Sequence, residues 1–129
     1  MTRRRSLAYV AACFALRAEG TKVLRGRLAK DRKINGITVR GDESVEAVLA
    51  DERVVGMDIE VEGESANGLF QANPIHTKPV HTYANGKRLI VSYWCDVCYI
   101  RFYKPGTCWC CQKESVLDPK DPNTPERVP

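Results

Sequence analysis

Two pairs of cysteines near the C-terminus constrain this chain more than any other feature. Cys95 and Cys98 form one Cys-x-x-Cys pair, Cys108 and Cys111 form a second, and nine residues separate the pairs. Two residues between thiols allow a tight turn that directs both sulfurs at one point, and a second such turn completes a tetrahedron with metal–sulfur distances of about 2.3 Å. One pair alone is a weak signal, whereas two pairs at this spacing predict a four-cysteine metal site.

The segment between the two pairs supports this interpretation. Tyr99–Tyr103 is rich in strand-forming residues, and Pro105-Gly106 is a turn signal that brings the second pair back to the first. We therefore expect a zinc-ribbon-like hairpin over residues 93–114, with zinc bound by the four cysteines. One feature is atypical, because glycine often follows the second cysteine of such a turn, and here Tyr99 and Gln112 stand in those positions.

The same cysteines admit other interpretations. Disulfides are favoured if the chain is exported, because oxidising compartments stabilise them, and iron fits the same thiolate cage as zinc. A thioredoxin-like redox role requires a Cys-x-x-Cys at the start of a helix, whereas the residues around Cys95 indicate strands. Cys110 is the odd member: it is either an alternative ligand in place of Cys108 or Cys111, a reactive thiol, or a spare thiol that is buried and inert, as we expect.

The first twenty residues have the order of an export signal. Three arginines, Arg3–Arg5, precede the apolar stretch Leu7–Leu16, and Ala18 is a small residue at the cleavage position. Cleavage after Ala18 would remove Cys13 and leave five cysteines, an odd number that cannot all pair within one chain. The basic and then apolar order of residues 1–20 nevertheless predicts an exported protein of the periplasm or cell envelope. The alternative is a cytoplasmic chain in which residues 1–20 form an amphipathic helix.

Composition and charge exclude several classes of protein. The chain has 129 residues, 43% of them hydrophobic, and no run approaches the ~20 apolar residues of a membrane-spanning helix, so a multi-span membrane protein is excluded. Residues 1–40 carry a net charge of +9, residues 41–66 of −8 and residues 67–129 of +3. The basic part would attract nucleic acid and the acidic part would repel it. We therefore expect solvated faces of opposite charge rather than a nucleic-acid surface.

From Lys22 onward the pattern is one of short strands joined by tight turns. Asn35-Gly36, Asn67-Gly68 and Asn85-Gly86 are hairpin turn signals, and each lies between runs of strand-forming residues. After the last of these turns, Lys87–Trp94 is expected to form one continuous strand that leads into the first cysteine pair.

One helix interrupts the strands and defines the fold class. Asp42 is typical of a helix N-cap, and the apolar residues of Val45–Leu49 have helical spacing. In Met57–Glu62 apolar and acidic residues alternate, as in a strand with one buried face. We predict a mainly β fold: a small OB-like antiparallel barrel with one short helix over residues 21–92, with an SH3-like barrel or an open meander as alternatives. Residues 115–129 form a Pro-rich tail that we expect to be a disordered or extended end.

Two blocks around the cysteines resemble the C-terminal signature of a family of small, uncharacterised and often exported bacterial proteins. The first block is Gly86–Cys98, which includes the run Tyr-Trp-Cys-Asp-Val-Cys, and the second is Ile100–Gln112. A weaker resemblance extends over Val23–Ile75. The resemblance implies a shared cysteine site and supports export. It implies no catalytic activity.

Other candidate residues do not form a catalytic set. His76 and His81 are expected to be solvated loop histidines rather than metal ligands. Asp58, Glu60 and Glu62 line one strand face without a partner that would make them an acid–base pair, so we expect a solvated acidic face. The chain has no Gly-rich phosphate loop and no nucleophile elbow. We therefore expect that the protein is not an enzyme.

The aromatic residues around the cysteines leave the partner open. Six aromatic residues in the range 93–109 are interleaved with cations, and such side chains either stack on single-stranded nucleic acid or form the core of a small ribbon, which we favour. The sequence predicts a non-enzymatic zinc-binding module whose four-cysteine site supports an interaction surface for a protein partner. The alternatives are an envelope redox or metal-handling thiol protein that uses Cys110, and a single-stranded nucleic-acid-binding protein made of the barrel and the ribbon.

Overall fold

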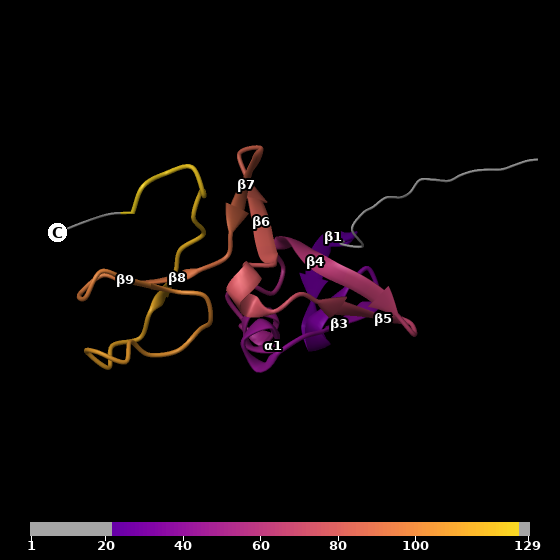
Figure 1. The fold of residues 1–129 in the computed structure, drawn as a ribbon, viewed down its shortest axis with the longest axis horizontal. Coiled ribbons are helices and arrows are strands. Elements are labelled where there is room, and N and C mark those ends of the chain that lie inside the picture. Colours follow the sequence, from indigo (N-terminus) through magenta and orange to yellow (C-terminus); the bar gives the residue numbers. More distant parts are fainter. Residues whose placement is uncertain (1–21, 127–129) are drawn as a thin grey trace, which may run out of the picture.

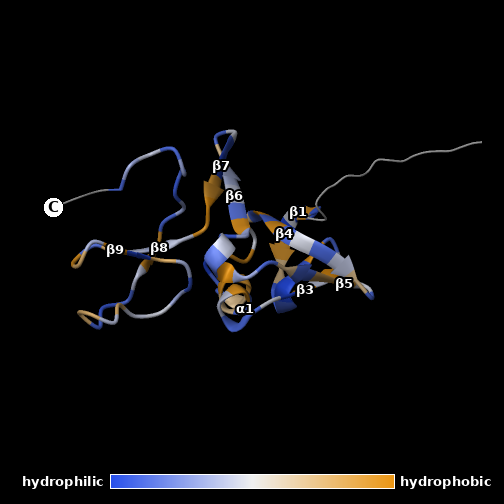
Figure 2. Ribbon diagram, in the orientation of Figure 1, coloured by the Kyte–Doolittle hydropathy of each residue, from blue (hydrophilic) through white to orange (hydrophobic). Residues whose placement is uncertain are grey.

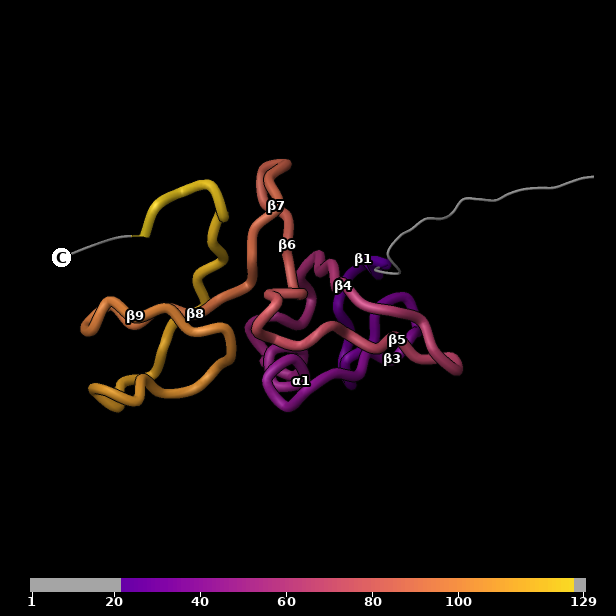
Figure 3. Tube along the Cα trace, in the orientation of Figure 1, coloured from indigo at the N-terminus to yellow at the C-terminus, as the bar shows by residue number. Residues whose placement is uncertain are grey.

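The computed structural model describes residues 22–126, which form a mainly β molecule (Figures 1 and 3). The predicted export segment, residues 1–20 with Cys13, lies outside the described residues. A barrel and an adjoining hairpin make up one end of the molecule, and the cysteines lie at the other end. No helix within the described range is long and apolar enough to cross a membrane.

Five strands close into a small barrel. They are β1 (Lys22–Ala29), β2 (Lys33–Ile34), β3 (Ile37–Arg40), β4 (Asp58–Ala66) and β5 (Leu69–Ala72). Neighbours pair in the order β1-β2-β3-β5-β4, and β4 pairs in turn with β1, so the ring is closed. The pairing of β3 with β5 is parallel, and the other pairings are antiparallel. A parallel pair needs a long connection, and here a helix and β4 lie between the two strands in the chain. The prediction of a small barrel with one short helix is confirmed, but the barrel is not wholly antiparallel, because β3 and β5 are parallel.

Local signals account for the turns and the helix of the barrel. Asn35-Gly36 and Asn67-Gly68 have positive φ angles at both residues, as type I′ hairpin turns require. The helix α1 (Glu43–Ala50) begins after Asp42, whose carboxylate accepts a hydrogen bond of 2.9 Å from the Val45 N–H. Single 3₁₀ turns, η4 (Lys30–Arg32) and η5 (Ile75–Thr77), follow β1 and β5.

One apolar core joins the helix to the strands (Figure 2). Each strand of the barrel contributes at least one inward-facing side chain, and α1 contributes three. Its members are Leu28, Ile34, Val39, Val45, Val48, Leu49, Val54, Ile59, Val61, Phe70, Ala72, Val80, Val91 and Tyr93. Fully burying one such aliphatic side chain contributes roughly 1.5–3 kcal/mol, so the barrel has its own source of stability.

A hairpin extends the sheet beyond the barrel. β6 (Val80–Ala84) pairs with β4, and β7 (Lys87–Ile90) pairs with β6 across the Asn85-Gly86 turn. The prediction of one strand over Lys87–Trp94 is wrong. The chain leaves the barrel sheet after β7, and the next strand, β8 (Tyr93–Cys95), belongs to a second sheet.

We call residues 93–117 the cysteine unit. Its central strand, β8, lies between β9 (Ile100–Phe102) and β10 (Val116–Leu117), and both neighbours are antiparallel to it. The sequence does not predict β10, because this pairing joins residues more than twenty positions apart and has no turn signal next to it. Tyr93 of β8 also belongs to the barrel core, so β8 connects the two parts of the molecule.

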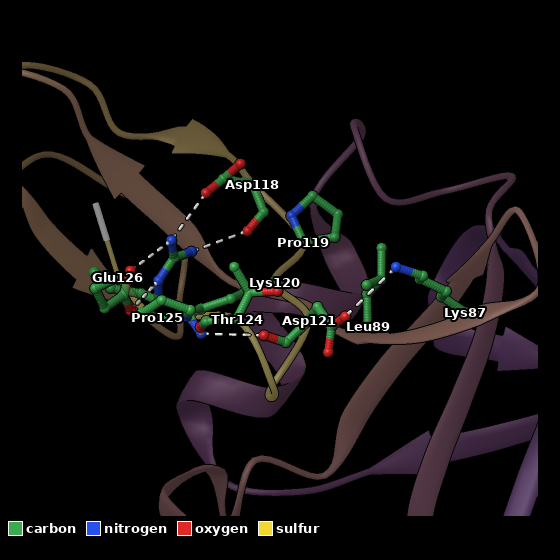
Figure 4. A pocket seen from close by; sticks show the side chains of 10 residues that line it. Lys87, Leu89, Asp118, Pro119, Lys120, Asp121, Thr124, Pro125 and Glu126 are labelled. Carbon is green, nitrogen blue, oxygen red and sulfur yellow. Dashed lines mark hydrogen bonds and ion pairs between the residues drawn. The ribbon is translucent and has the colours of Figure 1, made fainter.

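The tail segment, residues 118–126, is extended and returns to the hairpin. Backbone groups of Lys120 and Ile90 exchange two hydrogen bonds of 2.8 and 2.9 Å. The segment therefore continues along the outer edge of β7 instead of leaving the molecule. Figure 4 shows its side chains, from Asp118 to Glu126, beside Lys87 and Leu89 of that strand.

One arginine fixes the tail segment to the cysteine unit. Arg101 of β9 has only 8% of its side chain exposed, and its guanidinium donates hydrogen bonds of 2.6–3.0 Å to the carboxylates of Asp118 and Glu126. It also donates to the Ser92 hydroxyl at 2.8 Å and lies 4.9 Å from the centre of the Trp94 ring. We call this arrangement the Arg101 clasp. It links β9 to the tail segment, and one of its hydrogen bonds, of 3.0 Å, goes to the backbone carbonyl of Asp118.

Candidate metal centre

The structure brings the four predicted ligands together. The Sγ atoms of Cys95, Cys98, Cys108 and Cys111 all lie within 4.8 Å of one another. The Sγ atoms of Cys95 and Cys111 are 3.5 Å apart, too far for a disulfide bond, and the cysteines of the described range are free thiols. A tetrahedral ion with metal–sulfur bonds of about 2.3 Å separates its ligand sulfurs by about 3.8 Å. The cluster therefore has the size that one ion needs.

Two tight turns of the same design present these sulfurs. We call Cys95–Tyr99 the first knuckle and Cys108–Gln112 the second. In each knuckle the N–H of the last residue donates to the carbonyl oxygen of the first, at 2.9 Å in the first knuckle and 2.8 Å in the second. In addition, the Cys98 N–H donates to the Cys95 sulfur, and the Cys110 N–H donates to the Cys108 sulfur, both at 3.4 Å. Both first sulfurs thus accept a backbone hydrogen bond.

The residue that ends each knuckle has a left-handed backbone. Tyr99 has a φ of 57° and Gln112 a φ of 66°. Glycine adopts this conformation without strain, whereas other residues lose about 1–2 kcal/mol there. The Tyr99 ring packs edge-on against Trp94, with 5.7 Å between ring centres, and this contact offsets part of the cost. The missing glycines therefore leave the knuckle geometry intact.

The cluster has a buried side and an exposed side. The first cysteine of each knuckle, Cys95 and Cys108, is buried, whereas the second, Cys98 and Cys111, is half-buried. Cys110 is exposed, so the expectation of a buried spare thiol is wrong. The cause is local: the second knuckle directs Cys108 inward, and Cys110, two residues later at the outer part of the turn, faces solvent.

The thiols of the cluster have divergent acidities. The Cys98 N–H hydrogen bond is the main cause that lowers the pKa of Cys95 to about 7. The pKa of Cys98 is raised, first by its side-chain hydrogen bond with Cys110 and then by burial. Thiolates this close repel one another, so the free cluster retains protons on some of its sulfurs. A divalent cation held by these four sulfurs would remove that repulsion and replace those protons.

A hydrogen-bonded junction attaches the cysteine unit to the barrel. The hydroxyl of Tyr93 donates to the Asp51 carboxylate at 2.8 Å, and Arg53 pairs with the same carboxylate at 3.0 Å. Arg53 also donates to the backbone carbonyl of Ser115 at 3.1 Å. Burial would raise the pKa of Asp51, but the hydrogen bonds from Arg53 and Tyr93 outweigh it and lower that pKa below its ordinary value. The junction thus contains a stably ionised carboxylate.

The acidic face of β4 is not simply solvated, as the sequence led us to expect. The Asp58 carboxylate pairs with Arg25 at 2.8 Å, and Arg88 pairs with both Glu60 and Glu62 at 2.7 Å. Glu60 is buried under these partners, with 8% of its surface exposed. Arg25 comes from β1, which pairs with β4, and Arg88 comes from β7, which is separated from β4 by β6. The sequence of β4 alone therefore gives no sign of them.

The two histidines lie apart from the cysteines. His76 is exposed in η5, in agreement with the expectation of a solvated loop residue. His81 is buried in β6, so the same expectation is wrong for it. Burial is the main cause that lowers the pKa of His81, and this keeps its ring neutral at pH 7. Neither histidine belongs to the group that can hold a metal among the described residues.

Three supporting residues were missed by the sequence analysis. Arg101, Tyr93 and Asp51 anchor the cysteine unit through contacts with residues that are distant in the chain. For Tyr93 and Asp51 the local sequence gives no signal of this role. Arg101 alternates with apolar residues in a predicted strand, and an arginine on the buried face of a strand requires a partner.

The chain matches no protein-family model, no curated protein and no solved structure. The arrangement of its own residues is therefore what supports a function.

Proposed function

We propose that the protein is a non-enzymatic zinc-binding module in which the four cysteines hold a structural ion and the cysteine unit presents an interaction surface to a protein partner. The observation that carries the proposal is the convergence of four free thiols, from two knuckles of the same design, to within 4.8 Å of one another. When bound, the ion would link the knuckles and neutralise their sulfurs. Thiolate ligands, tetrahedral size and a closed ligand set are typical of structural zinc sites.

The small size of the local core supports a structural role for the ion. In the cysteine unit the buried hydrophobic residues that lie outside the barrel core are Trp94, Cys95 and Cys108. Two of these three are candidate ligands. Without a metal the unit would thus depend on one tryptophan, on the Arg101 clasp and on the Tyr93–Asp51 contact, and a fold of this size usually needs a metal or disulfides.

The choice of zinc rather than iron or disulfides rests on donor chemistry. Four thiolates bind either zinc or iron, and the redox-inert zinc ion suits a site that has no other function than to hold the chain. A disulfide between Cys95 and Cys111 would require their sulfurs to move together by more than an ångström from their separation of 3.5 Å.

Metal analysis of single cysteine variants tests the proposal. The wild-type protein, purified under reducing conditions, should contain one zinc per chain. Serine variants at Cys95, Cys98, Cys108 and Cys111 should each lose most of the metal, whereas Cys110→Ser, the matched control in the same knuckle, should retain it. Equal zinc content in Cys108→Ser and Cys110→Ser would contradict the proposed ligand set, and iron in the wild type would contradict the choice of metal.

The exposure of Cys110 supports a second candidate function, in redox or metal-handling chemistry. This thiol lies at the surface, and its interaction with the half-buried Cys98 is the first cause that raises the pKa of Cys98. In such a protein Cys110 would exchange with a ligand during metal transfer. The Cys110→Ser variant distinguishes the two candidate functions. Its zinc transfer to a chromophoric chelator should be slower than in the wild type if the second candidate is correct, and equally fast if the site is purely structural.

Export remains part of the proposal. It rests on the basic and apolar order of residues 1–20, and it would place the protein in the periplasm or cell envelope. The mass of the N-terminal peptide from protein secreted by a bacterial host tests it. A mature chain that starts after Ala18 is the expected result, and an intact Met1 in the cytoplasmic fraction would contradict export.

A further inference from the structure

The tips of both knuckles carry large side chains that are exposed to solvent. Val97 of the first knuckle is 54% exposed, Tyr99 is 41% exposed, and Trp109 of the second knuckle is 72% exposed. We call these three residues the tip surface. The other tryptophan, Trp94, is buried below it. Exposed tryptophan is uncommon on a monomeric surface and is enriched where proteins bind partners.

The tip surface surrounds the candidate metal centre. Its residues belong to two knuckles whose sulfurs lie within 4.8 Å of one another. Figures 1 and 3 show the loops after β8 and before β10 together at the end of the molecule that points away from the barrel. No element of the barrel covers this end.

The charges at this end favour a cationic ligand. Four thiolates around a divalent ion leave a net charge of −2 at the centre of the knuckles. Two cations of this region are paired with carboxylates, Lys113 with Asp96 at 3.5 Å and Arg53 with Glu114 at 3.9 Å. The negative charge of the centre is therefore not offset by them, although the whole chain has a net charge of +4.

The size of the tip surface limits the kind of partner. Three side chains of these types, partly exposed, offer about 400 Å² of accessible surface at most. A stable interface between folded proteins buries about 800 Å² on each partner. A second copy of this chain or a large globular partner would therefore need a further surface, whereas a short peptide segment would not.

We propose that the tip surface docks a short basic peptide segment of a partner protein. An apolar side chain of the segment would lie on Val97 and Tyr99, and a neighbouring arginine or lysine would lie on the face of Trp109. A cation over an indole ring is attracted by the electrons of the ring face, and a negative metal centre below would add to this attraction. This inference rests on the proposed function, because the negative charge belongs to the metal-bound thiolates.

The same charge argument disfavours phosphate ligands. Tyrosine and tryptophan at loop tips also stack on bases or insert into lipid headgroups. A phosphodiester backbone or an anionic lipid surface would, however, approach the −2 centre with its own negative charge. Single-stranded nucleic acid and anionic membranes are therefore outcomes against the proposal, and the experiment includes both.

Binding of labelled peptides to the zinc-loaded chain tests the proposal. The probes are a short peptide of alternating arginine and leucine, its counterpart with glutamate in place of arginine, an oligothymidylate, and phosphatidylglycerol vesicles. We expect the arginine peptide to bind and the glutamate peptide not to bind. Trp109→Ala should weaken binding about tenfold or more, as for an aromatic hot spot, and Val97→Ser by a smaller factor.

Val23→Ser provides the matched control. Val23 is 56% exposed, like Val97, but it lies on β1 of the barrel, so its replacement should leave peptide binding unchanged. Zinc content is measured for every variant. A zinc-loaded wild type that does not bind the arginine peptide, a Trp109→Ala variant that binds it as well as the wild type, or preferred binding of oligothymidylate or vesicles would overturn the inference. A wild type without zinc would instead refute the proposed function.

Discussion

The barrel and the cysteine unit are stabilised in different ways. The apolar core has fourteen members. Thirteen belong to the barrel, the β6–β7 hairpin and the residues that directly follow β7, and Tyr93 is the one member from the cysteine unit. The cysteine unit has three short strands and, apart from Tyr93, two buried thiols and one buried tryptophan as its apolar centre. The barrel follows the hydrophobic pattern of its sequence, and the unit depends on a few specific groups.

This difference determines how each part responds to damage. Apolar burial is distributed over many residues, so one change weakens the barrel by a limited amount. In the cysteine unit the metal site, the Arg101 clasp and the Tyr93–Asp51 contact each hold a separate connection. We therefore expect changes at these points to affect the unit and leave the barrel folded.

The largest effect should come from removal of the metal. Chelation, or the change Cys108→Ser, removes the link between the knuckles, and binding free energies of about 10–16 kcal/mol are typical of structural zinc sites. Amide hydrogen exchange should show loss of protection in β8, β9 and β10 and retained protection in β1 and β4. Cooperative loss of protection in both regions would show that the barrel is not independent.

The Arg101 clasp should give the next largest effect. Arg101→Met leaves the carboxylates of Asp118 and Glu126 without their buried cation, and such a change costs about 2–3 kcal/mol where the partners are partly exposed. Limited proteolysis should then cleave within the tail segment, while the zinc content stays the same. Arg101→Lys, which retains the charge but not the forked geometry, should be intermediate. Resistance of Arg101→Met to the protease would contradict a role of the clasp in holding this segment.

The junction should give a smaller effect, and one that depends on pH. Tyr93→Phe removes one hydrogen bond to Asp51 and should cost about 1 kcal/mol. The pKa of Asp51 is lowered in the folded state, so its contribution is complete above the ordinary value of 3.8 and is lost as the pH falls through the folded value. Urea unfolding of the wild type should therefore show a loss of stability below about pH 4. In Asp51→Asn this part of the pH dependence should be absent, and an unchanged profile would contradict the assignment.

The smallest effect should be a gain in stability. Gln112→Gly relieves the left-handed backbone at the end of the second knuckle and should stabilise the zinc-loaded unit by about 1 kcal/mol. Gln112→Ala is the control, because alanine retains the strain. Thermal unfolding monitored by the near-UV signal of the tryptophans compares the two. A glycine variant that melts no higher than the alanine variant would show that the knuckle is not strained at this residue.

Local chemistry explains which parts of the molecule could be predicted from sequence. The Asn-Gly turns, the Asp42 cap and the alternation along β4 are signals within a few residues, and the structure has each of them. The spacing of the cysteines is also local, and the four thiols do meet. β10 and the change of sheet after β7 depend instead on pairing between distant segments. So does the burial of Glu60, which pairs with Arg88 of β7, and that of His81, whose strand β6 lies between β4 and β7.

X-ray absorption at the zinc edge of the wild-type protein, purified under reducing conditions, tests the central claim most directly. The account predicts one zinc per chain, with four sulfur neighbours at about 2.3 Å and no nitrogen or oxygen neighbour. The same spectrum from Cys110→Ser should be identical. A first shell with fewer than four sulfurs, or a reduced chain that binds no zinc while the cysteine unit stays folded, would contradict the claim that the four cysteines form a structural metal site.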